Sequence, residues 1–416
     1  MQRTPRGNRL HLALFGRRNS GKSSLLNALT RQQVAIVSEV PGTTTDPVEK
    51  PMELLPIGPV LFIDTAGIDD SGTLGDQRVA RTRSVIQRTD VALLVCAAGR
   101  WESFEERLLE ELRAEERPVI VVANQSDRGR PAGDLRQRLR DAGIPLVETT
   151  ATRGQGLEEL RETLLAVTPP ELIAWPSIAG DLVPPGELAV LVVPLDMEAP
   201  KGRLILPQVQ TIRDLLDHDA CCLVVKEREL RQALERLNRP PALVVTDSQA
   251  FLKVAADTPP AIKMTSFSIL FARFKGDLVE FVRGALAIDR LRPGARVLIC
   301  EACTHHPIGD DIGRVKIPRW LRQYVGAPLE FQHKQGHDFP TDLDGTDLVV
   351  HCGACVQNRR EMLSRIHRCR QAGVPITNYG ITIAYTLGIF ERALSPFPAA
   401  WEVFRSARTD SLPEKV

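Results

Sequence analysis

The sequence predicts an α/β fold class in three consecutive regions, and two observations support this prediction. Short, almost continuously apolar runs alternate with amphipathic helical patterns along the chain, as they do where helices cover both faces of a parallel sheet. Proline clusters at 169–170, 184–185 and 259–260 interrupt this alternation. We therefore expect a first domain over residues 1–169 with a mostly parallel sheet, a small α/β middle domain over 170–260 and a C-terminal α/β domain over 261–416.

In the first domain the expected strands and helices alternate. The strands are residues 10–15, 60–64, 91–95, 118–123 and 145–148, and the helices are residues 23–30, 76–88, 104–115 and 157–165. In the middle domain, residues 188–194, 222–225 and 243–245 form apolar strand-like runs, and residues 204–216 and 230–237 follow helical patterns. The apolar helix 204–216 is either a core helix or a dimer interface.

In the third domain the pattern predicts strands at 296–300, 348–351 and 374–377. One long helix over 263–286 and two shorter helices over 318–324 and 358–372 complete this domain.

Composition narrows the classes of function. The 416 residues are 43% hydrophobic and 25% charged, which allows sizeable cores. A formal net charge of +1 excludes attachment to nucleic acid or anionic lipid through bulk charge, so we expect no nucleic-acid or membrane partner. No apolar run reaches the roughly 18 residues that span a bilayer, and the first residues are polar and basic. We expect a cytoplasmic protein.

A phosphate-binding motif follows the first strand. Residues 16–23 read Gly-Arg-Arg-Asn-Ser-Gly-Lys-Ser, which fits G-x-x-x-x-G-K-[ST] between a strand and a helix. The backbone N–H groups and the helix N-terminus would bind phosphate oxygens, Lys22 would reach the β- and γ-phosphates, and the Ser23 hydroxyl would bind Mg²⁺. The nucleotide-binding residues expected in this segment are Gly16, Asn19, Ser20, Gly21, Lys22, Ser23 and Ser24.

Four further segments complete a guanine-nucleotide site. Asp64 ends a strand and can hold the Mg²⁺ shell, Gly67 can sense the γ-phosphate, and Thr44 can join Mg²⁺ when γ-phosphate is present. Asp127, in Asn124-Gln125-Ser126-Asp127, can accept hydrogen bonds from guanine N1–H and N2–H₂, which adenine lacks. A backbone N–H in the segment of Thr150 and Ala151 can bind guanine O6. Lys22, Thr44, Asp64 and Gly67 are the predicted catalytic residues.

The order and spacing of these motifs over residues 9–167 resemble the translation-factor-type GTPases of the tRNA-modification and ribosome-assembly branch. Two residues depart from familiar patterns. Gln125 replaces the lysine of the guanine motif, and Ile68 stands where Ras-like proteins have a water-orienting glutamine. In similar GTPases a P-loop asparagine helps to hold K⁺, and Asn19 matches that position. The resemblance thus implies slow, K⁺-stimulated hydrolysis of GTP to GDP and phosphate.

The third domain holds a second candidate site. The chain has eight cysteines, and two Cys-x-x-Cys pairs, Cys300–Cys303 and Cys352–Cys355, each come at the end of a predicted strand. Parallel strands that end side by side bring the loops after them together. From spacing alone, three interpretations are open: buried free cysteines, a structural zinc with four thiolates, and an iron–sulfur cluster.

The whole chain resembles the FeFe-hydrogenase maturation GTPases, through Cys303-Thr304-His305 and His351-Cys352-Gly353-Ala354-Cys355 placed after a GTPase domain. The resemblance implies a middle dimerisation domain, a homodimer, and a C-terminal domain that binds a 4Fe–4S cluster. Cys303, Cys352 and Cys355 would ligate three irons. Glu301 is the first choice for the exchangeable fourth ligand, with His305 and His351 as alternatives, and Cys300 stays open.

The resemblance also implies a function and its partners. The family scaffolds the di-iron subcluster and delivers it to FeFe-hydrogenase apoprotein, after two radical-SAM maturases have acted. An alternative function is a tRNA- or ribosome-associated GTPase with a structural zinc domain, which would show a basic and aromatic patch on the third domain. A third is a GTP-sensing binding module without turnover.

Overall fold

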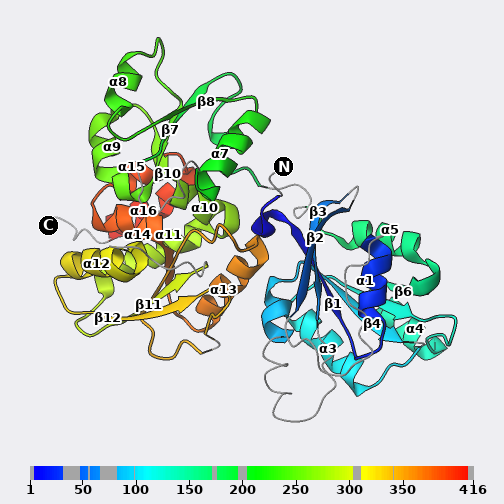
Figure 1. Ribbon diagram of the computed structural model, residues 1–416. Helices are drawn as coiled ribbons and strands as arrows, with labels where there is room; N and C mark the ends of the chain where they lie inside the picture. Colours follow the sequence, from blue (N-terminus) through cyan, green and yellow to red (C-terminus); the bar gives the residue numbers. More distant parts are fainter. Residues whose placement is uncertain are drawn as a thin grey trace. The chain divides into compact units, whose positions relative to one another are not determined.

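The computed structural model describes residues 4–30, 47–54, 57–65, 82–97, 99–170, 176–194, 204–302, 311–340 and 342–410. The chain divides into two compact units, residues 1–175 and residues 176–416, and each is described by itself (Figure 1). Within the described ranges no helix combines the length and the apolar character needed to cross a lipid bilayer.

The first unit is built on a six-stranded sheet in the order β2-β3-β1-β4-β5-β6. All neighbouring pairs are parallel except β2 with β3. The strands are β1 (Leu10–Phe15), β2 (Val48–Leu54), β3 (Gly58–Asp64), β4 (Val91–Ala97), β5 (Val119–Asn124) and β6 (Leu146–Glu148). Five of them lie where the sequence predicts a strand. The edge strand β2 is not predicted, because its sequence VEKPMEL contains charges and a proline.

Helices cover both faces of this sheet. They are α1 (Lys22–Thr30), residues 82–88, α3 (Ser103–Ala114), α4 (Gly133–Asp141) and α5 (Leu157–Val167), with short 3₁₀ turns η1 (Arg6–Asn8) and η2 (Ala151–Arg153). One core cluster joins the sheet to α1 and α5, and the other joins it to residues 82–88, α3 and α4. The α/β fold class with a mostly parallel first sheet is confirmed. Of the predicted helix 76–88, only residues 82–88 lie within the described part of the chain.

The second unit contains two four-stranded parallel sheets. The middle sheet has the order β10-β9-β7-β8, and the C-terminal sheet has the order β12-β11-β13-β14. The middle strands are β7 (Leu188–Val192), β8 (Cys221–Val225), β9 (Leu243–Thr246) and β10 (Met264–Ser266). The C-terminal strands are β11 (Arg296–Glu301), β12 (Glu330–Gln335), β13 (Leu348–His351) and β14 (Ile376–Asn378). β10 pairs with β9, so the middle sheet extends to residue 266, and the domain boundary at residue 260 stays a prediction.

One continuous hydrophobic core packs the helices of the second unit against both sheets. The helices are α7 (Leu206–Asp217), α8 (Leu230–Glu235), α9 (Phe251–Asp257), α10 (Phe267–Lys275), α11 (Leu278–Leu286), α12 (Ile317–Val325), α13 (Arg359–Gln371), α14 (Tyr379–Thr386), α15 (Phe390–Leu394) and α16 (Pro398–Asp410). Short turns are η3 (Gly180–Leu182), η4 (Ser248–Ala250), η5 (Ala287–Arg290) and a π-helical turn η6 (Ile312–Lys316).

The single helix predicted over 263–286 is wrong. The chain instead forms β10, then α10 and α11. The side chain of Ser266 caps α10 by accepting from the N–H of Ile269, and Asp277 caps α11 by accepting from the N–H of Glu280. Gly276 ends α10 between these caps. Two N-cap residues and a glycine therefore override the continuous apolar pattern.

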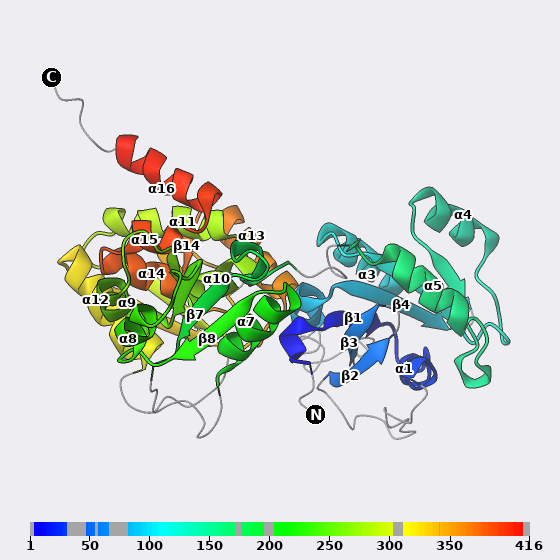
Figure 2. The ribbon, with the colours of Figure 1, turned by 90° about the horizontal axis from the view of Figure 1, so that it is seen from above.

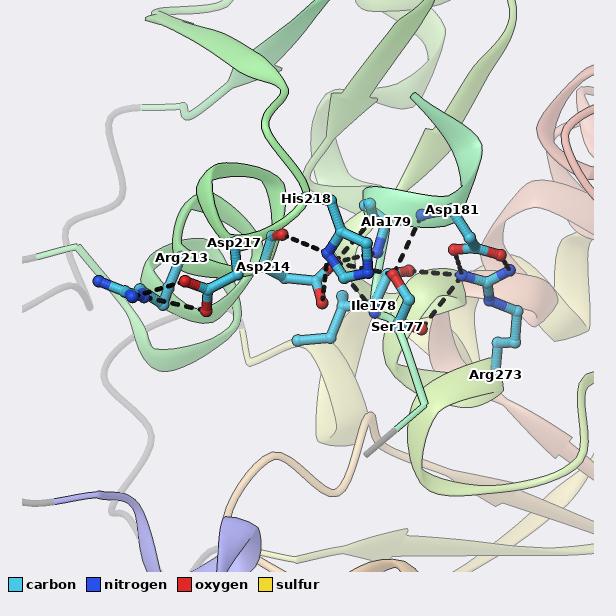
Figure 3. A network of polar contacts seen from close by, with 10 residues as sticks. Ser177, Ile178, Ala179, Asp181, Arg213, Asp214, Asp217, His218 and Arg273 are labelled. Atoms are coloured by element: carbon cyan, nitrogen blue, oxygen red, sulfur yellow. Dashed lines mark hydrogen bonds and ion pairs between the residues drawn. The ribbon is translucent and has the colours of Figure 1, made fainter. Parts of the chain in front are cut away.

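The first described residues of the second unit are held by a half-buried carboxylate on α7 (Figure 3). Asp214 Oδ2 accepts hydrogen bonds from the backbone N–H groups of Ile178, Ala179 and Gly180 at 3.1, 2.7 and 2.7 Å. The Ser177 hydroxyl donates to the same oxygen at 3.1 Å. Three converging amides and a hydroxyl satisfy this carboxylate and fix segment 177–181 on α7.

Two further residues of this network hold the segment in place. Gly180 packs so closely against His218 that a Cβ atom there would lie 2.3 Å from the imidazole ring. Arg273 of α10 binds Asp181 through both terminal nitrogens at 2.6 and 2.8 Å, and donates to the carbonyls of Ser177 and Ile178. The Arg273 guanidinium holds the pKa of Asp181 below its usual range against the opposing effect of burial. The segment is thus fixed to α7 and to α10.

We predict that Asp214→Ala destabilises the second unit by about 3 kcal/mol, because it leaves three backbone N–H groups without their charged acceptor. Guanidinium unfolding of the full chain, followed by circular dichroism, measures this loss. Asp217→Ala is the matched control on the same helix. It removes an exposed ion pair with Arg213 and costs roughly 0–1 kcal/mol. Equal losses in both variants would show that the Asp214 network adds no stability.

Candidate functional site

The loop between β1 and α1 has the backbone geometry of a phosphate-binding loop. Gly16 and Gly21 adopt φ angles of 146° and 87°, and a Cβ atom on Gly16 would lie 2.2 Å from the carbonyl oxygen of Val95. Only glycine fits at such a position. Lys22, the first residue of α1, donates through Nζ to the carbonyls of Gly16 and Arg17, both at 2.8 Å. The lysine therefore lies across the loop that the motif predicts.

Two predicted magnesium ligands are in direct contact. The hydroxyl of Ser23 donates to Asp64 Oδ2 at 2.7 Å, although 41 residues separate them in the sequence. Burial raises the pKa of Asp64, and the hydrogen bond from Ser23 and the charge of Lys22 oppose this rise. A hydroxyl and a carboxylate side by side are oxygen donors of the kind Mg²⁺ prefers, so these residues fit that ion.

Asn124, at the end of β5, connects the guanine motif to the phosphate loop. Its side-chain amide donates to the carbonyl of Ser20 at 3.1 Å, and its Oδ1 accepts from the Thr149 hydroxyl and the Ala151 N–H, both at 3.2 Å. A Cβ atom on Gly21 would lie 2.2 Å from Asn124 Nδ2. The Ala151 N–H, predicted for guanine O6, is engaged with Asn124 in this structure.

Gln125, the departure from the usual guanine motif, has a specific contact. It adopts a positive φ of 60° and its Nε2 donates to the carbonyl of Asn19 at 3.1 Å. Asn19 itself has a φ of 62°, a conformation that asparagine tolerates better than most residues. Sequence reasoning missed this bond, because it depends on a side chain that reaches across 106 residues of sequence.

Asp127, the predicted guanine selector, is one-quarter exposed and forms an ion pair with Arg153 at 3.4 Å. The hydroxyls of Ser126 and Thr150 lie 2.9 Å apart. Among the other predicted nucleotide residues, Ser20 is buried, and its hydroxyl has no partner in the part of the chain that the structure describes. Ser24 is half-buried on α1. Thr44 and Gly67 lie outside the described residues.

The cysteine motifs of the second unit meet at the ends of two neighbouring parallel strands. β11 pairs with β13, with Cys300 opposite His351. The Cys352 N–H donates to the carbonyl of Cys300 at 2.9 Å, and the Ala302 N–H lies 3.0 Å from Cys352 Sγ. Ala302 immediately precedes Cys303 in the sequence. Cys303 and His305 lie outside the described residues.

Cys300, Cys352 and Cys355 differ in their burial. Cys300 points into the core, where burial raises its thiol pKa to about 12. Cys352 and Cys355 are half-buried at the margin of the core. Between them Ala354 adopts a left-handed φ of 50°, which turns the short loop. Burial raises the pKa of Cys355, and the Lys275 ammonium opposes this rise.

A buried polar network supports the cysteine loop from behind. His351 Nδ1 lies 2.9 Å from the carbonyl of Cys352, and Arg365 donates to His351 Nε2 at 2.7 Å. Burial, and next the Arg365 charge, lower the pKa of His351 to about 3, so the ring is neutral and donates from Nδ1. Arg365 also bonds Glu361 and the carbonyl of Gly336, each at 2.7 Å. Both nitrogens of His351, an alternative fourth ligand, are therefore engaged.

Glu301, the first choice for the fourth ligand, is buried at the end of β11. Gln335 donates to one carboxylate oxygen at 3.0 Å and the Tyr379 hydroxyl to the other at 3.3 Å. Burial raises the pKa of Tyr379 well above its usual value, so the phenol stays neutral and acts as the donor. Each carboxylate oxygen has a second lone pair beside its hydrogen bond.

The donor set near Cys352 agrees with a thiolate-bound metal centre. Soft sulfur ligands in a tight loop suit iron–sulfur clusters and zinc, and a backbone N–H directed at Cys352 Sγ is the kind of contact that tunes such centres. Within the described ranges, no group of three or more His, Cys, Asp and Glu side chains is arranged to hold a metal. The third predicted sulfur, that of Cys303, belongs to a segment outside those ranges.

Three family models match the chain. The model described as 50S ribosome-binding GTPase matches residues 11–125. The hydrogen maturase F dimerization domain matches residues 178–276, and the hydrogen maturase F tetramerization domain matches residues 279–396. The last two together match more than half of the 416 residues.

Curated relatives match a little over a third of the chain. The tRNA modification GTPase MnmE of Aquifex aeolicus is 38% identical over 157 residues, which is 37% of this chain and 33% of the relative. That of Parasynechococcus marenigrum is 41% identical over 159 residues, 38% of this chain and 33% of the relative. The chain thus spans about a third of the length of these relatives. The G domain of the T. maritima FeoB iron transporter is 28% identical, with a TM-score of 0.31, over 38% of this chain and 99% of that one.

The family models match the segments that contain both candidate sites. The phosphate loop, the Ser23–Asp64 contact and the Asn124 bonds lie in the segment that is similar to GTPases. The pairing of β11 with β13, whose last pair is Cys300 with His351, lies in the segment matched by the tetramerization domain. The chain belongs to the hydrogen maturase F family, with an N-terminal domain of the ribosome-binding GTPase type.

Proposed function

We propose that this protein hydrolyses GTP and carries a 4Fe–4S cluster on which the di-iron subcluster of FeFe-hydrogenase is assembled or held for delivery. One observation carries the proposal most directly. The Ala302 N–H lies 3.0 Å from Cys352 Sγ, so the two cysteine motifs come together in a chain whose second unit matches hydrogen maturase F domains.

The nucleotide half of the proposal assigns roles to residues of the first unit. Lys22 and the loop amides bind the phosphates, and Ser23 and Asp64 hold Mg²⁺. Asp127 selects guanine. Asn19 provides an oxygen for K⁺, whose positive charge stabilises the transition state near the β/γ bridge. Thr44 and Gly67 complete the γ-phosphate contacts. The reaction is GTP plus water to GDP and phosphate.

The metal half assigns three iron ligands, Cys303, Cys352 and Cys355, and a replaceable fourth ligand, Glu301. A carboxylate that is already hydrogen-bonded to Gln335 and Tyr379 is a weaker ligand than a thiolate, because its charge is shared with two donors. When bound, the cluster offers one iron site to an incoming di-iron unit. His305 and Cys300 are the remaining alternatives, and the burial of Cys300 favours a role in the core.

The proposed partners are the proteins that would supply or receive the di-iron subcluster. FeFe-hydrogenase apoprotein receives the di-iron subcluster, and radical-SAM maturases supply or modify it. The alternative of a tRNA- or ribosome-associated GTPase is not favoured. The relatives named for tRNA modification match about 38% of the chain, whereas hydrogen maturase F domains match the second unit.

Exposed apolar side chains on β8 and on helix α7 support a homodimer. β8 is an edge strand, and its Val224 is 42% exposed. Helix α7 lies beside β8 (Figure 2). Leu204 precedes this helix, and Val209 and Leu216 lie on it. Leu216 is 54% exposed, whereas Leu215 of the same helix is buried. One face of the helix thus packs into the core, and apolar side chains on another face are exposed to solvent. These residues lie within the match to a dimerization domain, and we propose that a second copy covers them.

We predict that Cys352→Ser, Cys355→Ser and Cys303→Ser each lose most of the iron bound after anaerobic purification, because each removes one thiolate of a shared cluster. Iron and sulfide analysis together with EPR of the reduced protein measures this. The unaltered chain should hold about four irons.

Two variants serve as controls for the cysteine assignments. Cys300→Ala should keep its iron, because Cys300 is a core residue. Glu301→Gln should keep iron but alter the EPR signal of the reduced cluster. Iron loss in Cys300→Ala, with an unchanged signal in Glu301→Gln, would reverse the two assignments. Stoichiometric zinc without iron in the unaltered chain would overturn the cluster itself.

We predict that Asp127→Asn lowers the affinity for GTP by about a hundredfold or more and raises that for xanthosine triphosphate. The amide of asparagine can donate to the extra carbonyl of xanthine, where a carboxylate is repelled. Titration with fluorescent nucleotides measures both affinities. Asp134→Asn, at an exposed position on α4, is the matched control and should bind GTP as before. Unchanged GTP affinity in Asp127→Asn would contradict the role of this residue.

We predict faster GTP hydrolysis in K⁺ than in Na⁺ buffer, and loss of this difference in Asn19→Gly. Glycine retains the left-handed backbone conformation at φ 62° and removes the side chain together with its oxygen. Phosphate release at matched ionic strength measures the rates. In Na⁺ the variant and the unaltered chain should be equally slow. Equal rates in both salts for the unaltered chain would remove the K⁺ assignment.

A further inference from the structure

Helix α10 runs alongside the cysteine loop. A Cβ atom on Gly353 would lie 3.6 Å from Cβ of Phe271 and 4.0 Å from the Ser268 hydroxyl. Residues three or four apart on a helix share a face, so Lys275 continues the face formed by Ser268 and Phe271. The loop from Cys352 to Cys355 therefore packs against the side of α10 that ends at Lys275.

Lys275 is a buried cation. Only 1% of its surface is exposed, and its ammonium lies 4.9 Å from the centre of the Phe274 ring. Taking an ammonium out of water costs several kcal/mol unless negative charge compensates for it. The carboxyl end of a helix offers part of this compensation, because its carbonyl oxygens carry partial negative charge.

The positive charge of Lys275 acts electrostatically on Cys355. Burial raises the pKa of the Cys355 thiol, and the Lys275 ammonium acts in the opposite direction, together with the backbone N–H groups of Cys355 and Val356. The charge of Lys275 therefore acts on the loop that carries Cys355.

Arg359 fixes the end of α10. Its Nη1 donates to the carbonyls of Arg273, Phe274 and Gly276 at 3.2, 2.8 and 2.9 Å. Arg359 is the first residue of α13, and Asn358, which caps this helix, comes three residues after Cys355. The same guanidinium thus anchors the helix that carries Lys275 to the chain that leaves the cysteine loop.

We propose that Lys275 sets the reduction potential of the metal centre bound through Cys355, by supplying a fixed, buried positive charge. The inference rests on the proposed function, since it needs a redox-active cluster at this loop. Reduction by one electron adds one negative charge, and a nearby cation stabilises that state. Lys275 acts through Cys355 and does not ligate iron itself.

The test compares midpoint potentials, measured by redox titration with EPR detection on anaerobically prepared full-length protein. Two neutral variants, Lys275→Met and Lys275→Gln, should make the potential more negative by a tenfold change in the reduction equilibrium or more, about 59 mV. Lys275→Arg keeps the charge and should keep the potential close to that of the unaltered chain. Lys253→Met removes an exposed lysine on α9 and should leave the potential unchanged.

Each result decides the inference. An unaltered potential in both neutral variants, or an equal shift in Lys275→Arg, overturns it. If both neutral variants lose iron, thermal unfolding of their apoproteins decides. If the apoproteins of both variants keep their fold, the result supports a role of the Lys275 charge in retaining the cluster. If they are unfolded, Lys275 is merely structural and the inference is overturned. An unaltered chain that binds zinc and no cluster is a separate result, because it removes the proposed function.

Discussion

The parallel pairing of β11 with β13 is the constraint on which the second unit's site depends. The register that places Cys300 opposite His351 brings the residues after both strands to the same edge of the sheet. Two backbone contacts then close the arrangement, from the Cys352 N–H to the Cys300 carbonyl and from the Ala302 N–H to Cys352 Sγ. A shift of one residue would turn every side chain to the opposite face and separate these motifs.

Buried polar groups around this edge hold the loops without using the sulfurs. His351 hydrogen-bonds to Arg365 and to the backbone of Cys352, and α10 packs against Gly353 of the loop. The same helix binds segment 177–181 through Arg273. Within the second unit, therefore, one helix contacts both the segment that follows residue 175 and the cysteine loop.

Much of the fold could be predicted where the local pattern agrees with the tertiary environment. The strand 10–15 is observed with its predicted bounds, because this buried parallel strand is apolar except for His11 and a glycine loop ends it. The edge strands β2 and β12 were missed, since their exposed sequences VEKPMEL and EFQHKQ lack an apolar run. The helix predicted over 263–286 failed because its apolar content hides two capping residues, Ser266 and Asp277.

Some features of the two candidate sites could likewise be predicted from the sequence, and others could not. The motifs predicted that Ser23 and Asp64 serve the same Mg²⁺. They meet because β1, which precedes the phosphate loop, pairs with β3, which ends at Asp64. It also predicted that the two cysteine motifs meet. The bond from Gln125 to Asn19, the neutral His351 and the buried Lys275 could not be predicted, since each depends on how far a side chain reaches across the fold.

The most direct test is the position of iron in crystals of anaerobically prepared protein, located by anomalous scattering at the iron absorption edge. The account predicts a single iron-containing centre beyond the ends of β11 and β13, bonded to the sulfurs of Cys303, Cys352 and Cys355. Anomalous signal elsewhere in the chain, or a centre that omits Cys352, would contradict it.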